Sequence, residues 1–63
     1  MLKLEIKTGG AAFRDPISGD EDFYAEGDEL SRLLKKVAGE IRGGSTSGSI
    51  IDINGNKVGI WSR

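Results

Sequence analysis

The segment "DINGNKVG", residues 52–59, decides how the end of this chain folds because it contains the dipeptide Asn54-Gly55. A two-residue type I′ turn needs positive φ at both central positions, and Asn-Gly adopts that conformation at the least cost. Apolar residues flank the dipeptide on both sides. The sequence therefore predicts a β-hairpin over residues 49–61 with a two-residue turn at its centre.

The length of this turn fixes which hairpin residues share a face. With two residues in the turn, one face collects four apolar side chains, and we expect it to face the core. These are Ile51, Ile53, Val58 and Ile60. The opposite face then holds Ile50, Asp52, Lys57, Gly59 and Trp61. A three-residue loop is the alternative, and it would turn Trp61 inward.

The same segment also has the alternating oxygen ligands of a calcium-binding loop, in Asp52, Asn54 and Asn56. Such a loop has Gly at its sixth position and a bidentate Glu at its twelfth. Counted from Asp52, these positions hold Lys57 and Arg63, and we expect strands instead of helices on either side. The sequence therefore favours a turn over a metal site, and we expect no bound metal.

A second strand is expected at the start of the chain, over residues 1–8. Apolar and charged residues alternate there with a period of two, which is typical of a half-buried strand. Leu2, Leu4 and Ile6 lie on the face predicted to be buried. Lys3, Glu5 and Lys7 lie on the face predicted to be exposed.

A helix is expected over residues 28–42. Asp28 is a suitable N-cap, and Gly43 is positioned as a left-handed C-terminal cap. Apolar residues recur between them at spacings of three and four, which forms one stripe along a helix. The stripe consists of Leu30, Leu33, Leu34, Val37 and Ile41.

Two connections join these elements. Residues 9–27 carry several glycines and a proline without any period, so we expect a long loop, with Ala11–Phe13 and Phe23–Tyr24 anchoring its ends. Residues 43–48 are rich in Gly and Ser and form a connector. A phosphate-binding loop would require a following Gly-Lys-Ser/Thr and a helix, and neither is present.

The order strand, loop, helix, hairpin predicts a single two-layer β-α-β-β domain of the α+β class over residues 1–63. We expect a three-stranded antiparallel sheet with the helix on one face, because antiparallel sheets tolerate one open face. A parallel pairing of the first two strands is the alternative. The predicted core is the alternating face of the first strand, the helix stripe and the four-residue apolar face of the hairpin.

The composition bounds the function. The 63 residues include no Cys and no His, which excludes disulfides, thiolate zinc sites and His-based catalysis. A chain this short offers little concave surface, so we expect no enzyme and no cofactor. The net charge of −1 argues against nonspecific nucleic-acid binding, which needs a basic surface. The charges near the N-terminus argue against a signal peptide, and the apolar runs are too short for a membrane helix. We therefore expect a cytoplasmic location.

Two surfaces are candidates for binding a partner. The first is the open face of the sheet, where an exposed Trp among charges has the composition of a binding hot spot. It would consist of Lys3, Glu5, Lys7, Ile50, Lys57 and Trp61. The second is an acidic loop, which consists of Asp20, Glu21, Asp22, Phe23, Tyr24 and Glu26. The alternative for Trp61 is that it folds over Gly59 and Ile50 or packs under the long loop.

Three segments carry a resemblance to known proteins: "KLEIKTGGAAF" at 3–13, "DELSRLLKKVAGEI" at 28–41 and "DINGNKVGIW" at 52–61. Together they resemble a group of short, uncharacterised bacteriophage and prophage proteins. The resemblance covers roughly half to two thirds of the chain. The connection at residues 14–27 is longer than the corresponding connection in the pattern of these proteins. The resemblance implies a phage-encoded protein in the host cytoplasm that binds and blocks a host or defence protein, as anti-CRISPR proteins do.

The sequence thus leaves three functions open. The first is a non-enzymatic inhibitor that binds a host or defence protein through the acidic loop or the open sheet face. The second is an assembly module that forms a homodimer, which buries Trp61 and Ile50 or joins sheet edges. The third is a weak nucleic-acid binder that uses Lys3, Lys7 and Lys57, with Trp61 as a stacking platform.

Overall fold

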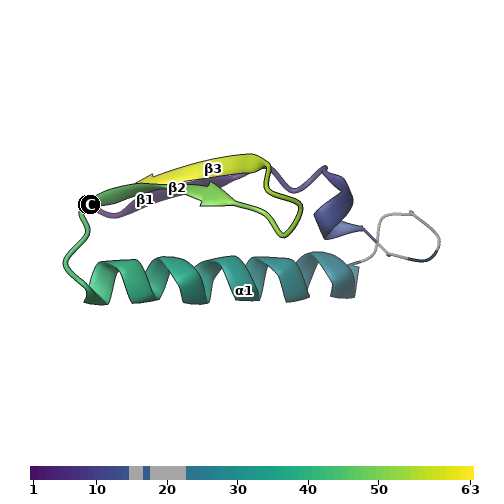
Figure 1. The fold of residues 1–63 in the computed structure, drawn as a ribbon, viewed down its shortest axis with the longest axis horizontal. Coiled ribbons are helices and arrows are strands. Elements are labelled where there is room, and N and C mark those ends of the chain that lie inside the picture. The colour runs from purple at the N-terminus through teal and green to yellow at the C-terminus, as the bar shows by residue number, and fades with distance from the viewer. Residues whose placement is uncertain (15–16, 18–22) are drawn as a thin grey trace.

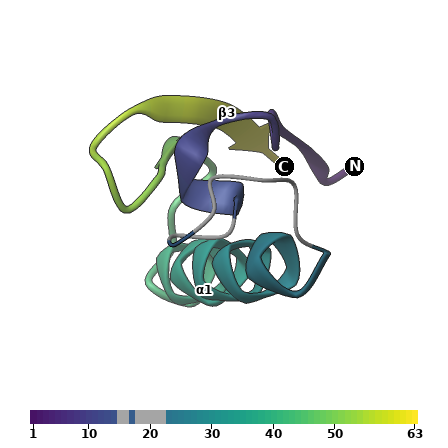
Figure 2. The same ribbon diagram turned by 90° about the vertical axis from the view of Figure 1, so that its right-hand side faces the viewer.

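The fold consists of a three-stranded sheet that lies over one long helix (Figures 1 and 2). A computed structural model describes residues 1–14, 17 and 23–63. Its elements are β1 (Lys3–Ile6), the 3-10 turn η1 (Ala11–Phe13), α1 (Phe23–Arg42), β2 (Ser47–Ile51) and β3 (Lys57–Ser62). β3 is the central strand and pairs antiparallel with both neighbours. The predicted α+β class, with an antiparallel sheet and one helix, is confirmed.

Strand β1 follows the predicted alternation. Leu4 and Ile6 pack against the core, while Lys3, Glu5 and Lys7 are exposed on the other face. Leu2 precedes the strand and is exposed, so its assignment to the core was wrong.

Helix α1 begins at Phe23, upstream of the predicted start at Asp28. Asp28 is therefore an exposed residue inside the helix and not its N-cap. Gly27 suggested a boundary, but an internal Gly costs a helix only about 1 kcal/mol. α1 packs against η1, which contributes the buried Phe13 and anchors the start of the connection as expected.

The helix ends at Arg42, as predicted, but the left-handed residue lies one position further along than predicted. Gly44 has a φ of +101°, and the N–H of Ser45 donates to the carbonyl of Glu40 at 3.0 Å. The N–H of Gly44 donates to the carbonyl of Ile41 at 3.0 Å. These two bonds form a Schellman-type cap that satisfies the last helical carbonyls.

The hairpin turn is longer than a type I′ turn. Gly55 has a φ of +85°, but no non-glycine residue in the described part of the chain has a positive φ, so Asn54 does not meet the type I′ requirement. The N–H of Gly55 donates to the carbonyl of Asp52, and the N–H of Asp52 donates to the carbonyl of Asn56. The chain therefore reverses over Ile53, Asn54 and Gly55, which is the three-residue alternative.

An irregularity in the strand pairing follows the turn. Ile51 pairs with Lys57, whereas Ile50 pairs with Gly59, so Val58 is an extra residue on β3. This β-bulge takes up the extra residue, so the pairs from Ile50–Gly59 to Ser47–Ser62 follow one regular register. As a result Ile50 and Trp61 face the helix and Ile60 faces outward. The predicted assignment of hairpin faces was therefore wrong.

The core gathers on the helix-facing side of the sheet. Its buried apolar residues are Phe13, Leu33, Val37, Ile50 and Trp61. Partly buried residues pack around them, namely Leu4, Ile6, Ala12, Leu30, Ile41 and Val58. Four predicted core residues are instead 48–69% exposed: Leu2, Leu34, Ile53 and Ile60. Ile51 is half-buried.

Trp61 lies between the sheet and α1 in a site shaped by a glycine. Its indole Nε1–H donates to Oε2 of Glu40 at 3.0 Å, so the one polar atom of the buried ring is paired. A Cβ at Gly48 would lie 2.7 Å from that nitrogen. Because Gly48 has no side chain, the ring can lie against β2 and reach the helix at once.

Candidate interaction surface

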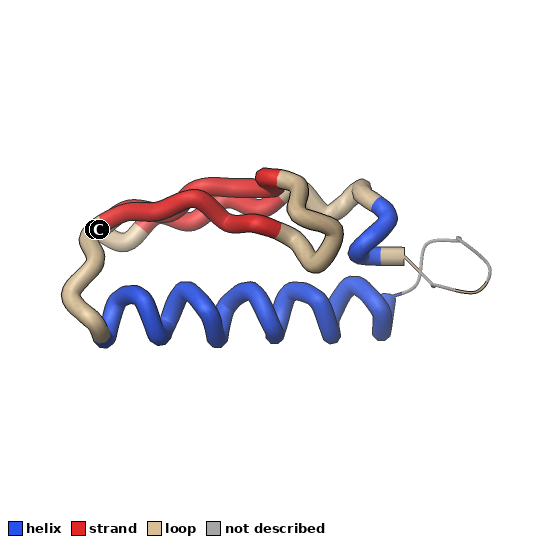
Figure 3. Tube along the Cα trace, viewed as in Figure 1, coloured by secondary structure: helices blue, strands red, loops and turns tan. Residues whose placement is uncertain are grey.

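The outer face of the sheet lies on the side opposite α1, and no described helix covers it (Figure 3). Ile60 lies on the central strand of this face and is 53% exposed. It pairs with Glu5 of β1 on one side and with Ser49 of β2 on the other. An apolar side chain thus lies on the central strand between a charged and a small neighbour.

Two depressions flank Ile60 on this face. The larger, of about 460 Å³, is lined by residues of all three strands, including Lys3, Glu5, Ser47 and Ser49. The smaller, of about 280 Å³, is lined by residues that include Glu5, Lys7 and Lys57. No lining residue of either depression comes from α1, so both open on the outer face.

Three lysines surround these depressions, and among the described residues Glu5 is the only carboxylate that lines them. This local excess of positive charge contrasts with the net charge of −1 of the whole chain. A surface of this kind favours association with an acidic partner and makes that association sensitive to salt.

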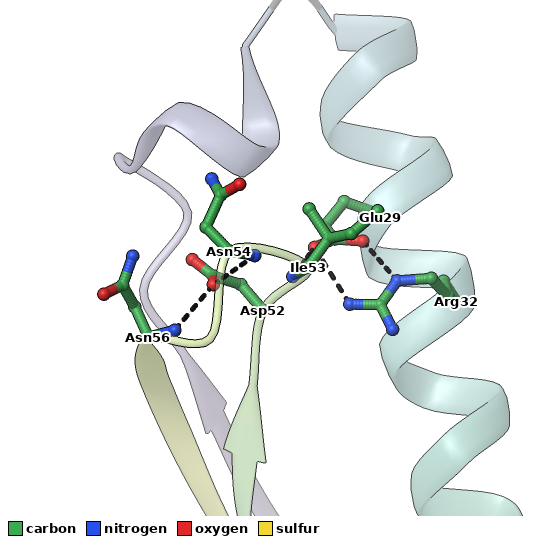
Figure 4. A network of polar contacts seen from close by, with 6 residues as sticks. All are labelled: Glu29, Arg32, Asp52, Ile53, Asn54 and Asn56. Atoms are coloured by element: carbon green, nitrogen blue, oxygen red, sulfur yellow. Dashed lines mark hydrogen bonds and ion pairs between the residues drawn. The ribbon is translucent and has the colours of Figure 1, made fainter.

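A network of polar contacts joins α1 to the hairpin at the other side of the sheet (Figure 4). Arg32 donates to both carboxylate oxygens of Glu29, with Nε 2.6 Å from Oε1 and Nη2 3.1 Å from Oε2. The backbone N–H of Ile53 donates to Oε2 of Glu29 at 2.9 Å. Glu29 is only 6% exposed, and these bonds hold its pKa below the ordinary value. The bond from Arg32 is the largest cause and outweighs the opposing effect of burial.

Asp52 organises the turn itself. Its Oδ1 accepts the backbone N–H of Asn54 at 2.9 Å and that of Asn56 at 2.8 Å (Figure 4). Asp52 is 5% exposed, so this carboxylate is directed into the loop. Of the three alternating oxygen-bearing residues, Asp52 thus bonds the turn through its side chain, and Asn54 and Asn56 take part through their backbone N–H groups. In the described part of the chain, no cluster of three or more acidic side chains could hold a metal ion.

A third depression, of about 370 Å³, lies next to this network. It is lined by residues of η1, α1 and the turn, including Glu29 and Asn54. Both buried carboxylates near it already have hydrogen-bond partners. In the described residues, no buried side-chain polar atom lacks a partner. The buried polar groups of this region therefore stabilise the fold, and none of them points to a ligand.

The open-face prediction is confirmed for the exposure of its charged members. Lys3, Glu5, Lys7 and Lys57 are all exposed and line the two outer depressions. It is wrong for Ile50 and Trp61, which are both 2% exposed and belong to the core. Ile60 is instead an exposed apolar residue of this face.

The acidic-loop prediction lies partly outside the described residues. Asp20, Glu21 and Asp22 are not among them. Phe23, Tyr24 and Glu26 belong to the first turns of α1, where Tyr24 is 81% exposed and Glu26 is half-buried. Residues 23–27, which were predicted to end the loop, therefore belong to α1.

Ile60 was missed as a surface residue because the hairpin faces were chosen by counting apolar residues. A signal for the correct choice was present in the sequence. Trp61 buries far more surface than any single Ile of the opposite face, and neighbouring strand residues point to opposite faces. Placing Trp61 in the core would have placed Ile60 on the outside.

No helix among the described residues has the length and apolar character needed to cross a membrane. Comparison of the chain with family models, with curated proteins and with solved structures found no match.

Proposed function

We propose that this protein is a small, non-enzymatic protein-binding module that contacts its partner through the outer face of the sheet. The observation that carries the proposal is the exposure of Ile60 at the centre of this face. A central apolar residue within a polar rim is the arrangement found at protein–protein interfaces. The lysines around it suit a partner with an acidic surface.

The resemblance to short phage and prophage proteins supports a more specific form of this proposal. In that form, the protein is phage-encoded and inhibits a host or defence protein in the host cytoplasm, as anti-CRISPR proteins do. The fold supports inhibition by occupancy, because the polar groups buried in it are engaged in structural hydrogen bonds. The outer face would act by covering a functional surface of the target.

Burial of Trp61 weakens the two alternative functions. A homodimer through Trp61 and Ile50 would have to open the core, although a dimer that joins sheet edges needs neither residue. A nucleic-acid binder that stacks bases on Trp61 meets the same obstacle. Lys3, Lys7 and Lys57 remain available for phosphate contacts, so the test below includes a nucleic-acid control.

The test compares two charge insertions at apolar residues of similar exposure on opposite sides of the molecule. Ile60→Asp alters the outer face, while Leu34→Asp alters the solvent side of α1, where Leu34 is 48% exposed. Tagged full-length chains are used to capture proteins from a bacterial host lysate treated with nuclease. We expect Ile60→Asp to lose the captured protein, because loss of a hot spot costs about 2 kcal/mol, or about thirtyfold in affinity.

Leu34→Asp should capture as the unaltered chain does, and circular dichroism should show both variants to be folded. Equal capture by both variants would contradict the proposal. A third variant with Asp20→Asn, Glu21→Gln and Asp22→Asn tests the acidic segment. Loss of capture in that variant alone would transfer the binding function to the segment. The same chains are also tested for binding of labelled single-stranded DNA. DNA binding by the unaltered chain that is equal in Ile60→Asp would favour the nucleic-acid alternative.

A further inference from the structure

The edge of the sheet formed by β2 is uncharged and borders the outer face. We infer that this edge binds an extended segment of the partner protein, which pairs with β2 as an additional strand. The inference rests on the proposed function and deepens it, because it states how the partner approaches Ile60 and what kind of segment it presents.

The backbone hydrogen bonds of β2 show which groups this edge offers. The N–H of Arg63 donates to the carbonyl of Thr46 at 2.9 Å, which fixes the phase of the pairing with β3. In an antiparallel pair, alternate residues direct their backbone groups toward the neighbouring strand and away from it. Ser47, Ser49 and Ile51 therefore direct their N–H and carbonyl groups away from β3. Within the described residues, β2 pairs with β3 alone.

The two edges of the sheet differ in charge. β1 has the sequence KLEI and is followed by Lys7, so it presents alternating charged side chains. Charged residues on an edge strand oppose pairing with another strand. β2 has the sequence SGSII and carries no charge and no proline. Of the two edges, β2 is therefore the better template for an added strand.

The side chains of β2 leave room above the outer face. Glu5, Ile60 and Ser49 lie side by side across the three strands. Because Ser49 is small, a large apolar side chain of an added strand could lean across it and cover Ile60. Strand addition of this kind draws affinity from the main chain and specificity from alternate side chains. The expected ligand is an extended segment with a large apolar residue opposite Ser49 and acidic residues toward the lysines.

A second copy of this chain fits the edge less well. Two β2 strands can pair about a two-fold axis at Ser49 or at Ile50, and the second register would place Ile51 opposite Ser49. In either register the added strand is SGSII, which brings no carboxylate to the lysines of the outer face. Charge complementarity therefore favours a different protein as the partner.

The test uses backbone methylation, which removes one N–H and leaves every side chain unchanged. At 63 residues the full chain is accessible by chemical synthesis. One version carries an N-methyl group on Ser49, whose N–H points to the free edge. The matched control carries it on Leu4, whose N–H points to the other edge, since the N–H of Lys7 donates to Val58 on β3. Methylation at either site spares the bonds to β3.

The probe is a peptide selected from a displayed library of random decapeptides by binding to the unmodified chain. We expect N-methyl-Ser49 to bind the labelled peptide at least about tenfold more weakly in fluorescence anisotropy, because a main-chain hydrogen bond is lost and close approach is blocked. N-methyl-Leu4 should bind it unchanged. Failure to select a peptide, or equal binding by N-methyl-Ser49, would overturn the inference. Concentration-dependent dimers that N-methyl-Ser49 abolishes would overturn it in favour of a second copy.

The capture assay separates failure of this inference from failure of the proposed function. If Ile60→Asp loses the captured protein and N-methyl-Ser49 retains it, the outer face binds a partner but not by strand addition. If neither change affects capture, the proposed function fails as well.

Discussion

Glu29 is the residue through which α1 holds the turn of the hairpin. Its carboxylate is buried, accepts two hydrogen bonds from Arg32 and accepts the N–H of Ile53. Glu29→Gln keeps the size of the side chain but removes its charge. We expect this change to lower the free energy of unfolding by about 1–3 kcal/mol at neutral pH, because bonds to a charged group are lost.

The same contacts make the contribution of Glu29 depend on pH. The pKa of Glu29 is lower in the folded chain than its ordinary value of 4.5. The stabilisation is therefore complete above pH 4.5 and is lost as the pH falls through the lower folded value. Urea unfolding at about pH 7 and about pH 3 should show the difference between the original chain and Glu29→Gln shrinking in acid. Asp28→Asn, at an exposed neighbour, is the control. A difference that stays constant with pH would refute this role.

Ile60 and Trp61 show, at the level of single residues, why the binding face was not predictable by counting. Alternation correctly indicated that these neighbours lie on opposite faces of the sheet. It could not indicate which of the two faces α1 would cover. Four apolar residues favoured one face, but the area of Trp61 and the bulge at Val58 favoured the other. The face that α1 covers decides which apolar residue the binding surface exposes, and the structure exposes Ile60 and not Trp61.

Gly59 controls the pairing between the elements β1 and β3. A Cβ at this position would overlap the carbonyl oxygen of Glu5, which belongs to the backbone of β1. We expect Gly59→Ala to destabilise the fold toward the upper end of about 1–3 kcal/mol, because backbone must move to relieve the overlap. Chemical unfolding of the variant measures this.

Gly39 provides the matched control for that substitution. It lies exposed within α1, and a Cβ there would have no neighbour within 4 Å. Gly39→Ala should stabilise the chain by about 1 kcal/mol, since it only raises helix propensity. If the two alanine substitutions had the same effect, the close approach of β1 to Gly59 would be refuted.

The elements were predictable to the extent that local periodicity determines them. Alternation identified β1, and the helix stripe with its terminal glycines located the end of α1. The start of α1 was missed because Gly27 suggested a boundary, whereas packing against η1 offsets its cost. The turn was correctly expected at Asn54-Gly55, but it also includes Ile53, and its length depends on Asp52, whose carboxylate bonds the loop backbone. Such bonds are not visible in a hydrophobic pattern.

At the scale of the whole molecule, the helix covers one face of the sheet and leaves the other open (Figures 1 and 2). The core closes between sheet and helix around Trp61, and this closure sets Ile60 outward. The proposed binding face and the proposed docking edge both depend on that orientation. If Trp61 faced outward, Ile60 would be a core residue and neither proposal would hold.

Fluorescence of Trp61 tests this orientation most directly, because the chain contains a single Trp. Spectra and acrylamide quenching are recorded at a protein concentration where sedimentation shows a monomer, first folded and then in urea. We predict blue-shifted emission and weak quenching in the folded chain, with a red shift on unfolding, since the ring is 2% exposed. Emission that is already solvent-like in the folded monomer, and readily quenched, would contradict the account.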